Sequence, residues 1–504
     1  MGVVVFIILM GLELGLCAWT LTKHKETGKW VKNRLLVTGA QWGVIAFLVL
    51  LPIGNKWLRL GGCFVILSIR LLIDVIRFWK KRKQGEPQAE QRISTKREGQ
   101  LRGKAKTITA AVTGCIVIAI SLFTAFAFTG YQSLPVTGAY DVGMVQAILV
   151  DENRLEAFEG DGSHREVPIY MYYPEKRRAE RGKKAENSVA DGKFPLIFFS
   201  HGAFGYYQSN SSTYMELASH GYVVISMDHP YHSFFTKDTE GKTILVNPEF
   251  IQTALRVGNA EDGEIPEEEI FTTTRDWMQL REEDMSFVID EVRRQSAAFE
   301  GLDGMSVAEG RSMKADAAEN KTAGFGTAWH LESKGDAETW KQVLSSIDAE
   351  KVGLMGHSLG GATSVTIGRL KSDVVDAVID LDGTMLGEQL SYDNGTYQYL
   401  SEPYPVPLLA INNENHQKDL EEYGALYVNG AVLANAKDAR YTYFKGSGHM
   451  NFTDLPLISP FLASWLGTGS IDAKECVETM NGIILQFFDH YLRGTGELQI
   501  QECY

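Results

Sequence analysis

Cysteine and proline are both sparse in this chain of 504 residues, which has 5 cysteines and 14 prolines. No two cysteines form a C-x-x-C pair, so neither a zinc ribbon nor a thioredoxin-type redox site is supported. So few cysteines also exclude a small scaffold stapled by disulfides. The sequence leaves undecided whether Cys476 and Cys503 form a disulfide, which requires that this part of the chain faces an oxidising compartment.

Positive charge is scarce beyond the first 130 residues. Residues 1–130 carry 19 Lys and Arg against 6 Asp and Glu, whereas residues 131–504 carry 30 against 57. The strongly acidic larger part argues against nucleic acid as a partner. The change of sign predicts two parts in different compartments, a membrane region over 1–130 and a second domain over 131–504.

The first part contains four apolar runs, each close to the ~20 residues that a membrane-spanning helix needs. We expect transmembrane helices over 3–22, 35–53, 57–79 and 108–129. The third run carries the most charge, and its alternative is a helix that lies on the membrane surface.

The charges within and between these runs predict how the region is oriented. In the third run Arg70 and Asp74 are four residues apart, a spacing that lets them pair on one helix face. Basic residues gather after the first run, over 23–34, and after the third, over 80–106. The positive-inside rule places both loops in the cytoplasm, and therefore the N-terminus and residues 131–504 outside. We expect a multi-pass plasma-membrane protein whose first run is retained, since that run lacks a basic start and a small-residue cleavage site.

From residue 131 on, short apolar runs rich in β-branched residues alternate with helical patterns. Because continuous apolar strands are typical of sheets covered on both faces, we expect an α/β fold with a mostly parallel central sheet and helices on both faces. The expected strands are 142–150, 167–173, 195–200, 222–228, 352–356, 374–382, 406–412 and 440–445, and the expected helices are 212–220, 285–296 and 358–370.

The segment 255–340 does not fit this alternation. It contains the acidic stretch 261–269 and the polar, Gly- and Ala-rich stretch 300–338. Two interpretations stay open: these are solvated insertion loops, or they form a lid over the site, since insertions at strand ends often carry specificity.

The strongest chemical motif is Gly356-His357-Ser358-Leu359-Gly360, which fits the pattern G-x-S-x-G. It follows an expected strand and opens an expected helix, the strand–turn–helix context that exposes a nucleophilic serine. The flanking glycines relieve crowding around a strained serine backbone. Ser358 is therefore the candidate nucleophile.

A serine hydroxyl needs a base to take its proton. His449 lies in a Gly-rich loop directly after the expected strand 440–445, where a short loop can aim an imidazole back at the serine. His449 is therefore the candidate base, and His416 and His490 are its downstream competitors.

The imidazole in turn needs an acid that fixes its tautomer. The strand A-V-I-D-L-D-G carries Asp380 and Asp382, which share a face because they are two residues apart. Asp382 is the last residue before Gly383 and better fits the strand end where such an acid sits. The order Ser, Asp, His is that of the α/β-hydrolase fold, which we expect for residues 131–504.

Acyl transfer also needs backbone donors for the developing oxyanion. The strand P-L-I-F-F-S runs into an H-G-A turn, and such a turn after an early strand supplies one donor in this fold. We expect the N–H groups of Ala203 and Leu359 to fill this role.

A D-H-x-x-H cluster, formed by Asp228, His229 and His232, follows the next expected strand. We expect these to be polar residues at the rim of the pocket, with a metal site as the alternative.

Together these motifs resemble the plasma-type (intracellular type II) platelet-activating factor acetylhydrolases. The resemblance runs over about residues 135–495. Its most specific segments are F-S-H-G-A followed by E-L-A-S-H-G-Y-V-V at 199–224, V-G-L-M-G-H-S-L-G-G-A-T at 352–363, D-L-D-G at 380–383, and K-G-S-G-H-M-N-F-T-D at 445–454. The resemblance implies a serine-dependent phospholipase of the α/β-hydrolase fold that needs no cofactor. Carried over by motif, Ser358 is the nucleophile, Asp382 the acid and His449 the base, with Ala203 and Leu359 as oxyanion donors.

Three features depart from that family. Gly383-Thr384 stands where the family has a bulky aromatic residue, an acidic segment is inserted, and the four-span region has no counterpart in the animal enzymes. We expect a membrane-anchored serine esterase that acts on short-acyl or oxidised phospholipids or related lipid esters. The alternatives are a general carboxylesterase, a dienelactone-hydrolase-like enzyme or a peptidase and, in another class, a non-catalytic sensor or transporter accessory. No metal or nucleic-acid partner is expected, and the oligomeric state stays open.

Overall fold

The structure is a computed structural model that describes most of the chain. The described residues are 2–23, 27–50, 56–83, 103–123, 127–128, 133–177, 189–258, 260, 263–303, 328–331 and 334–504. By their contacts they divide into two compact units, one made of Met1–Gln132 with Pro456–Trp465 and the other of Ser133–Leu455 with Leu466–Tyr504.

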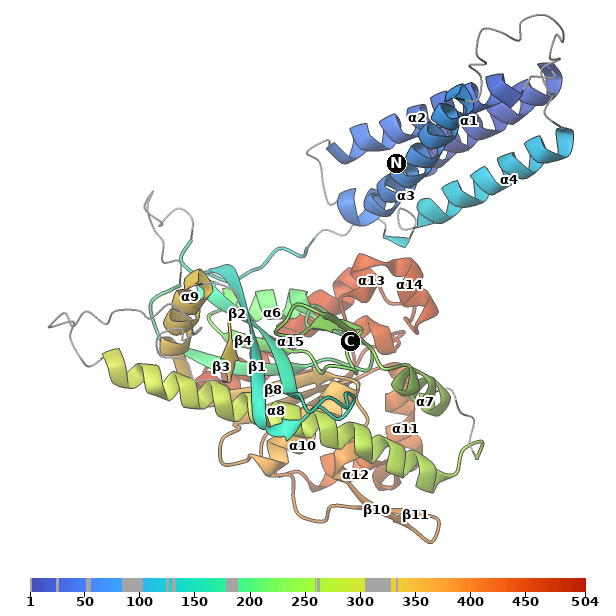
Figure 1. The fold of residues 1–504 in the computed structure, drawn as a ribbon. Coiled ribbons are helices and arrows are strands. Elements are labelled where there is room, and N and C mark those ends of the chain that lie inside the picture. Colours follow the sequence, from blue (N-terminus) through green and yellow to red (C-terminus); the bar gives the residue numbers. More distant parts are fainter. Residues whose placement is uncertain are drawn as a thin grey trace, which may run out of the picture. The chain divides into compact units, whose positions relative to one another are not determined.

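The first unit consists mainly of helices (Figure 1). The four long ones are α1 (Gly2–Lys23), α2 (Thr27–Leu50), α3 (Lys56–Lys83) and α4 (Lys104–Ser121). Among the described residues, three stretches are long and apolar enough to cross a membrane, and they lie in α1, α2 and α4. The helix α3 contains the third apolar run, but it carries too many charged residues to count as a candidate membrane span.

Buried charges connect the helices of this unit. Glu13 on α1 accepts hydrogen bonds from Arg34 on α2 and from Arg70 on α3, the latter over 2.8 Å between Nη2 and Oε2. Asp74 instead lies 3.7 Å from Arg34 and 3.5 Å from Arg77. Arg70 therefore pairs with an acid on another helix and not with Asp74, the partner that the spacing suggests.

The second unit is built on a nine-stranded sheet in the order β13-β12-β9-β8-β3-β4-β2-β1-β7. Figure 1 labels β1, β2, β3, β4 and β8 of this sheet. Its strands are β1 (Asp141–Leu155), β2 (His164–Glu175), β3 (Phe194–Ser200), β4 (Val223–Met227), β7 (Trp329–His330), β8 (Ile347–His357), β9 (Ala377–Leu381), β12 (Leu408–Asn412) and β13 (Ala439–Tyr443).

The strands from β13 to β4 are parallel to their neighbours, and β2, β1 and β7 extend the sheet in antiparallel fashion. The strands β3, β4, β9 and β12 are buried along their whole length. They appear as continuous apolar runs in the sequence because helices cover both faces of such strands. The predicted mostly parallel sheet of an α/β-hydrolase fold is confirmed.

Helices and two small hairpins complete this unit. The helices are α6 (Ser211–Ser219), α7 (Pro248–Gly258), α8 (Glu267–Asp303), α9 (Lys334–Ser345), α10 (Leu359–Leu370), α11 (Glu414–Tyr423), α12 (Val428–Asn435) and α15 (Ala473–Arg493). Two further short helices, α13 (Leu455–Ile458) from its second residue on and α14 (Pro460–Trp465), fall in the first unit. Three short 3-10 turns are η1 (Leu386–Glu388), η2 (Gly424–Leu426) and η3 (His449–Phe452). The hairpins are β5 (Phe235–Lys237) with β6 (Thr243–Leu245), and β10 (Gln389–Asp393) with β11 (Thr396–Tyr399).

The segment 255–340 contains α8, a single helix of 37 residues. Met285, Val288, Ile289 and Val292 on α8 are fully buried in the main hydrophobic core, because their spacing places them on one helix face. Much of the predicted insertion is therefore part of the packed fold. Residues 304–327, which hold most of its polar stretch, lie outside the described residues, and a lid role stays a prediction.

All five cysteines are free thiols, so the disulfide that the sequence left open is not formed. Cys476 is buried on α15, and Cys503 lies half-buried near the C-terminus.

Candidate active site

Ser358 occupies the sharp turn between β8 and α10. Its backbone has φ 55° and ψ −125°, a conformation that costs a non-glycine residue free energy. Its N–H donates to the carbonyl of Leu381 on β9 over 2.9 Å. This strained strand–turn–helix arrangement is the one that presents a serine side chain at the end of a parallel sheet.

The glycines around Ser358 allow backbone segments to approach closely. A Cβ on Gly356 would lie 2.2 Å from the carbonyl oxygen of Gly360, and a Cβ on Gly360 would lie 2.0 Å from that of Ser200. Real Cβ atoms do not come so close to backbone atoms, so both positions of the G-x-S-x-G motif require glycine.

Asp382 and His449 are brought together from elements far apart in sequence. Asp382 directly follows β9, and His449 begins the short 3-10 turn η3. His449 Nδ1 lies 2.6 Å from Oδ2 of Asp382, and the carboxylate is fully buried while the imidazole is 37% exposed. A buried carboxylate that holds Nδ1 of a partly exposed imidazole leaves Nε2 free to exchange a proton.

His357 ties His449 to the nucleophile turn. Burial lowers the pKa of His357 to about 3, and the nearby His449 adds to the effect. The neutral imidazole donates from Nε2 to the carbonyl of His449 over 3.1 Å, and the two ring centroids are 4.6 Å apart. Among the described residues the Ser358 hydroxyl makes no hydrogen bond to His449. Such bonds are often long in ligand-free enzymes and tighten when substrate binds.

The competing residues take other places. Asp380 is fully buried and accepts a hydrogen bond from the Gly383 N–H over 3.0 Å. His416 Nδ1 lies 3.2 Å from Oδ1 of Asp382, so this competitor contacts the same carboxylate. His490 is on α15 and contacts the carbonyl of Gly496 over 3.0 Å.

Asn413 also holds Asp382, and sequence reasoning missed it. Its backbone N–H donates to Oδ1 of Asp382 over 2.6 Å and its Nδ2 donates to Oδ2 over 2.7 Å. Its side-chain oxygen caps α11, so the residue is fixed at both ends. The available signal was an asparagine directly after an apolar strand and before a helix, a typical N-cap position.

The charge of Asp382 is stabilised by its surroundings. Burial alone raises the pKa of this carboxyl group. The charge and contact of His416 and the hydrogen bond from His449 outweigh burial, and they hold the pKa of Asp382 well below its usual value. The acid is therefore ionised at neutral pH.

The two expected oxyanion donors lie beside Ser358. Leu359 is the first residue of α10, so its N–H has no intrahelical acceptor. A Cβ on Gly202 would lie 3.1 Å from Cβ of Ser358, which places the Gly202–Ala203 peptide against the nucleophile. Leu359 and Ala203 also belong to one apolar cluster. Its buried members are Phe250, Met278, Leu359 and Ala362, and Ala203, Phe204, Val246, Ala254, Trp277 and Leu386 pack against them.

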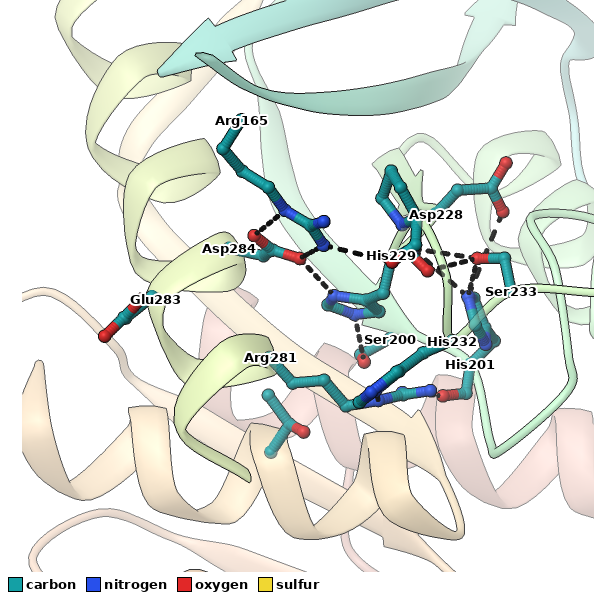
Figure 2. Close-up of polar contacts among 12 residues, drawn as sticks. Arg165, Ser200, His201, Asp228, His229, His232, Ser233, Arg281, Glu283 and Asp284 are labelled. Atoms are coloured by element: carbon teal, nitrogen blue, oxygen red, sulfur yellow. Dashed lines mark hydrogen bonds and ion pairs between the residues drawn. The ribbon is translucent and has the colours of Figure 1, made fainter. Parts of the chain in front are cut away.

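A second Ser-His-Asp set, which sequence reasoning missed, is formed by Ser200, His229 and Asp284 (Figure 2). Ser200 Oγ donates to Nε2 of His229 over 2.9 Å, and His229 Nδ1 donates to Asp284 over 3.0 Å. All three side chains are fully buried. Asp284 is also paired with Arg165 over 2.7 Å. Since no ester can reach this hydroxyl, we assign this set a structural role.

The D-H-x-x-H cluster belongs to the same buried network. Asp228, His229 and His232 are all buried. Burial lowers the pKa of His229 to about 4, and the charge of Arg281 adds to the effect. Both nitrogens of His229 are engaged, and Arg281 approaches His232. A buried guanidinium repels a cation, so these residues do not suit a metal, and the described residues contain no group of metal-binding side chains.

Comparisons with known proteins relate the chain to a family. The family model described as platelet-activating factor acetylhydrolase, isoform II, matches residues 170–500. The platelet-activating factor acetylhydrolase of Canis lupus familiaris is 25% identical over 313 residues, which cover 60% of this chain and 57% of the dog protein. That of Cavia porcellus is 27% identical over 314 residues, covering 60% and 58%. The match thus spans less than three fifths of the length of these relatives.

Among solved structures, a ferulic acid esterase from Streptomyces cinnamoneus covers 74% of this chain and 96% of its own, with a TM-score of 0.49 and 18% identity. The family model accounts for well over half of the chain. The chain therefore belongs to the platelet-activating factor acetylhydrolase, isoform II, family.

Proposed function

We propose that this protein is a serine esterase in which Ser358, His449 and Asp382 act as nucleophile, base and acid. The observation that carries the proposal is the 2.6 Å contact between His449 Nδ1 and Asp382, beside a serine held at φ 55°. Family membership supports the same chemistry.

The proposed reaction has two halves. Ser358 Oγ attacks the ester carbonyl while His449 Nε2 takes the hydroxyl proton, and the carbonyl oxygen becomes an oxyanion held by the N–H groups of Ala203 and Leu359. His449 then protonates the departing alcohol, which leaves an acyl group on Ser358. Water, deprotonated by His449, attacks the acyl group, and the imidazolium returns that proton to Ser358 Oγ as the acyl–oxygen bond breaks and the carboxylic acid leaves. Asp382 stabilises the imidazolium in both halves.

We propose a lipid ester with a short or oxidised acyl chain as substrate. The curated relatives are named for platelet-activating factor, and the apolar cluster beside Ser358 suits an acyl chain. A general esterase or a peptidase would share the triad but would not share a preference for short-acyl phospholipids.

A fluorophosphonate probe and a substrate panel test this proposal on the full-length chain in lipid nanodiscs. We expect one labelled peptide, containing Ser358, and faster hydrolysis of an sn-2 acetyl phospholipid than of its palmitoyl counterpart. Hydrolysis of a p-nitrophenyl ester alone would leave a general esterase, and the absence of labelling in folded protein would leave a non-catalytic role.

We further propose that α1 to α4 anchor the protein in the plasma membrane, with the second unit outside the cytoplasm. Three of these helices are apolar enough to span, and the basic residues of 23–34 and 80–106 favour the cytoplasmic side.

Cysteine accessibility tests this orientation in intact cells. Lys242 is exposed in the second unit, and Arg82 is exposed at the end of α3. We expect a membrane-impermeant maleimide to label Lys242→Cys in intact cells and Arg82→Cys only after lysis, each above the background of the native cysteines. The reverse pattern would overturn the orientation.

A further inference from the structure

Arg281 on α8 is a fully buried cation that contacts the loop after β3 (Figure 2). It donates from Nη1 to the carbonyl of His201, from Nη2 to the carbonyl of Gly202 over 3.3 Å, and from Nε to Nδ1 of His232 over 3.3 Å. Burial lowers the pKa of Arg281 to about 9, with Arg165 adding to this and Asp284 opposing it, so the group is charged at neutral pH.

The partners of this cation are unusual. Within the part of the chain that the structure describes, no carboxylate lies within ion-pair distance of Arg281. The carboxylate of Asp284, one helical turn away on α8, pairs with Arg165 and His229 instead. A buried charge without a direct counter-ion is costly. The contacts of Arg281 are instead two successive main-chain carbonyls and a neutral imidazole.

Those carbonyls belong to the loop that supplies the proposed oxyanion donor. The Gly202 carbonyl and the Ala203 N–H are parts of one planar peptide group, which is trans and therefore points them in opposite directions. The Gly202 oxygen also accepts from His201 Nδ1 over 2.6 Å, and Ser233 contacts the other ring nitrogen of His201 over 2.7 Å. Two donors on the oxygen thus fix where the Ala203 N–H points, and the charge of Arg281 polarises that N–H into a stronger donor.

We propose that Arg281 is a positioning residue for acyl transfer, which orients and polarises the Gly202–Ala203 peptide so that the Ala203 N–H faces the developing oxyanion. This inference rests on the proposed esterase function. Arg281 touches neither the substrate nor Ser358, and its effect falls on the transition state, where the oxyanion exists, more than on binding of the substrate.

Arg165 offers a matched control. It is equally buried and belongs to the same network, because it pairs with Asp284 over 2.7 Å and with Glu156 over 2.8 Å. Its main-chain contact is the carbonyl of Pro230 over 3.3 Å, outside the loop of His201 and Gly202. Loss of Arg165 removes a buried charge of the same kind without releasing the oxyanion loop.

The experiment uses the full-length chain in nanodiscs with Arg281→Met, Arg281→Lys and Arg165→Met. We measure kcat and KM for p-nitrophenyl acetate, Tm, and the Ki of a trifluoromethyl ketone, whose serine adduct carries an oxyanion. For Arg281→Met we expect kcat to fall roughly 100- to 1,000-fold with KM changed by less than about threefold, and Ki to rise in proportion to the loss of kcat. Arg281→Lys should show a smaller loss of kcat and a smaller rise of Ki than Arg281→Met, since an ammonium group can reach one of the two carbonyls. Arg165→Met should lower Tm but keep kcat within about fivefold.

Equal losses of kcat in Arg165→Met and Arg281→Met, or an unchanged Ki in a folded Arg281→Met protein, would overturn the proposal. If Arg281→Met does not fold, Arg281→Lys decides, because it keeps the buried charge: a lower kcat with unchanged KM and a higher Ki supports the role, and wild-type kcat and Ki overturn it. Ser358→Ala in the same assay separates the two hypotheses. If Ser358→Ala retains activity, the esterase mechanism itself fails.

Discussion

Ser358→Ala should lower kcat for p-nitrophenyl acetate by roughly 10,000-fold or more in the full-length protein. The hydroxyl is the proposed nucleophile, and alanine keeps the turn at φ 55° without supplying an atom that can attack. Labelling by a fluorophosphonate should vanish with the activity. Both are measured on protein whose Tm matches that of the wild type.

Ser200→Ala is the matched control, because the chain holds two Ser-His-Asp sets. Ser200 is fully buried and donates to His229 over 2.9 Å. Its loss leaves an imidazole without one hydrogen bond, which costs about 1–3 kcal/mol of stability, and it removes no group from the proposed site. We expect kcat within about fivefold of wild type. Full activity in Ser358→Ala, or equal losses in both variants, would contradict the assignment of Ser358.

The two serines also show what sequence can and cannot reveal. Ser358 was predictable because its motif is local: the glycines that a tight turn requires lie within two residues of it. The Ser200 set joins β3, the loop after β4 and the middle of α8, which are brought together only by the fold. Geometry alone does not rank the two sets. Burial does, and burial of a particular polar side chain depends on long-range packing.

The strands of the main sheet, except β7, could be predicted from sequence for a similar local reason. Fully buried strands such as β3 and β12 leave an unbroken apolar run, whereas the strands of the hairpins β5–β6 and β10–β11 are short and partly exposed and were not foreseen. His229 and His232 were expected at a rim because histidine is polar. They are buried because α8 supplies Asp284 and Arg281 as partners. A helix inside a predicted insertion thus determines the environment of histidines that lie 49 and 55 positions before it in the chain.

Asp382→Asn should lower kcat by roughly 1,000- to 10,000-fold while KM changes little. The carboxylate accepts the Nδ1 proton of His449 and counters the imidazolium that forms during the reaction. An amide has no charge to offer. Its NH2 group would also meet the donors His449 and Asn413, so the imidazole would turn or adopt the wrong tautomer. Steady-state kinetics from pH 5 to 9 check whether the loss of kcat persists across the whole pH range.

Asp380→Asn separates a missing acid from a damaged strand, because the two aspartates lie on the same strand end two residues apart. Burial raises the pKa of Asp380 well above its usual value, and the charge of Asp382 adds to this against the opposing effect of His416, so the group is neutral and an amide imitates it closely. An asparagine oxygen can still accept the Gly383 N–H that Oδ1 now binds. We therefore expect Asp380→Asn to keep kcat within about tenfold. If kcat of Asp380→Asn falls as far as that of Asp382→Asn, the loss reflects the strand end as a whole. If Asp382→Asn keeps more than a tenth of wild-type kcat, another group orients His449, and His416 and Asn413 are the residues to examine next.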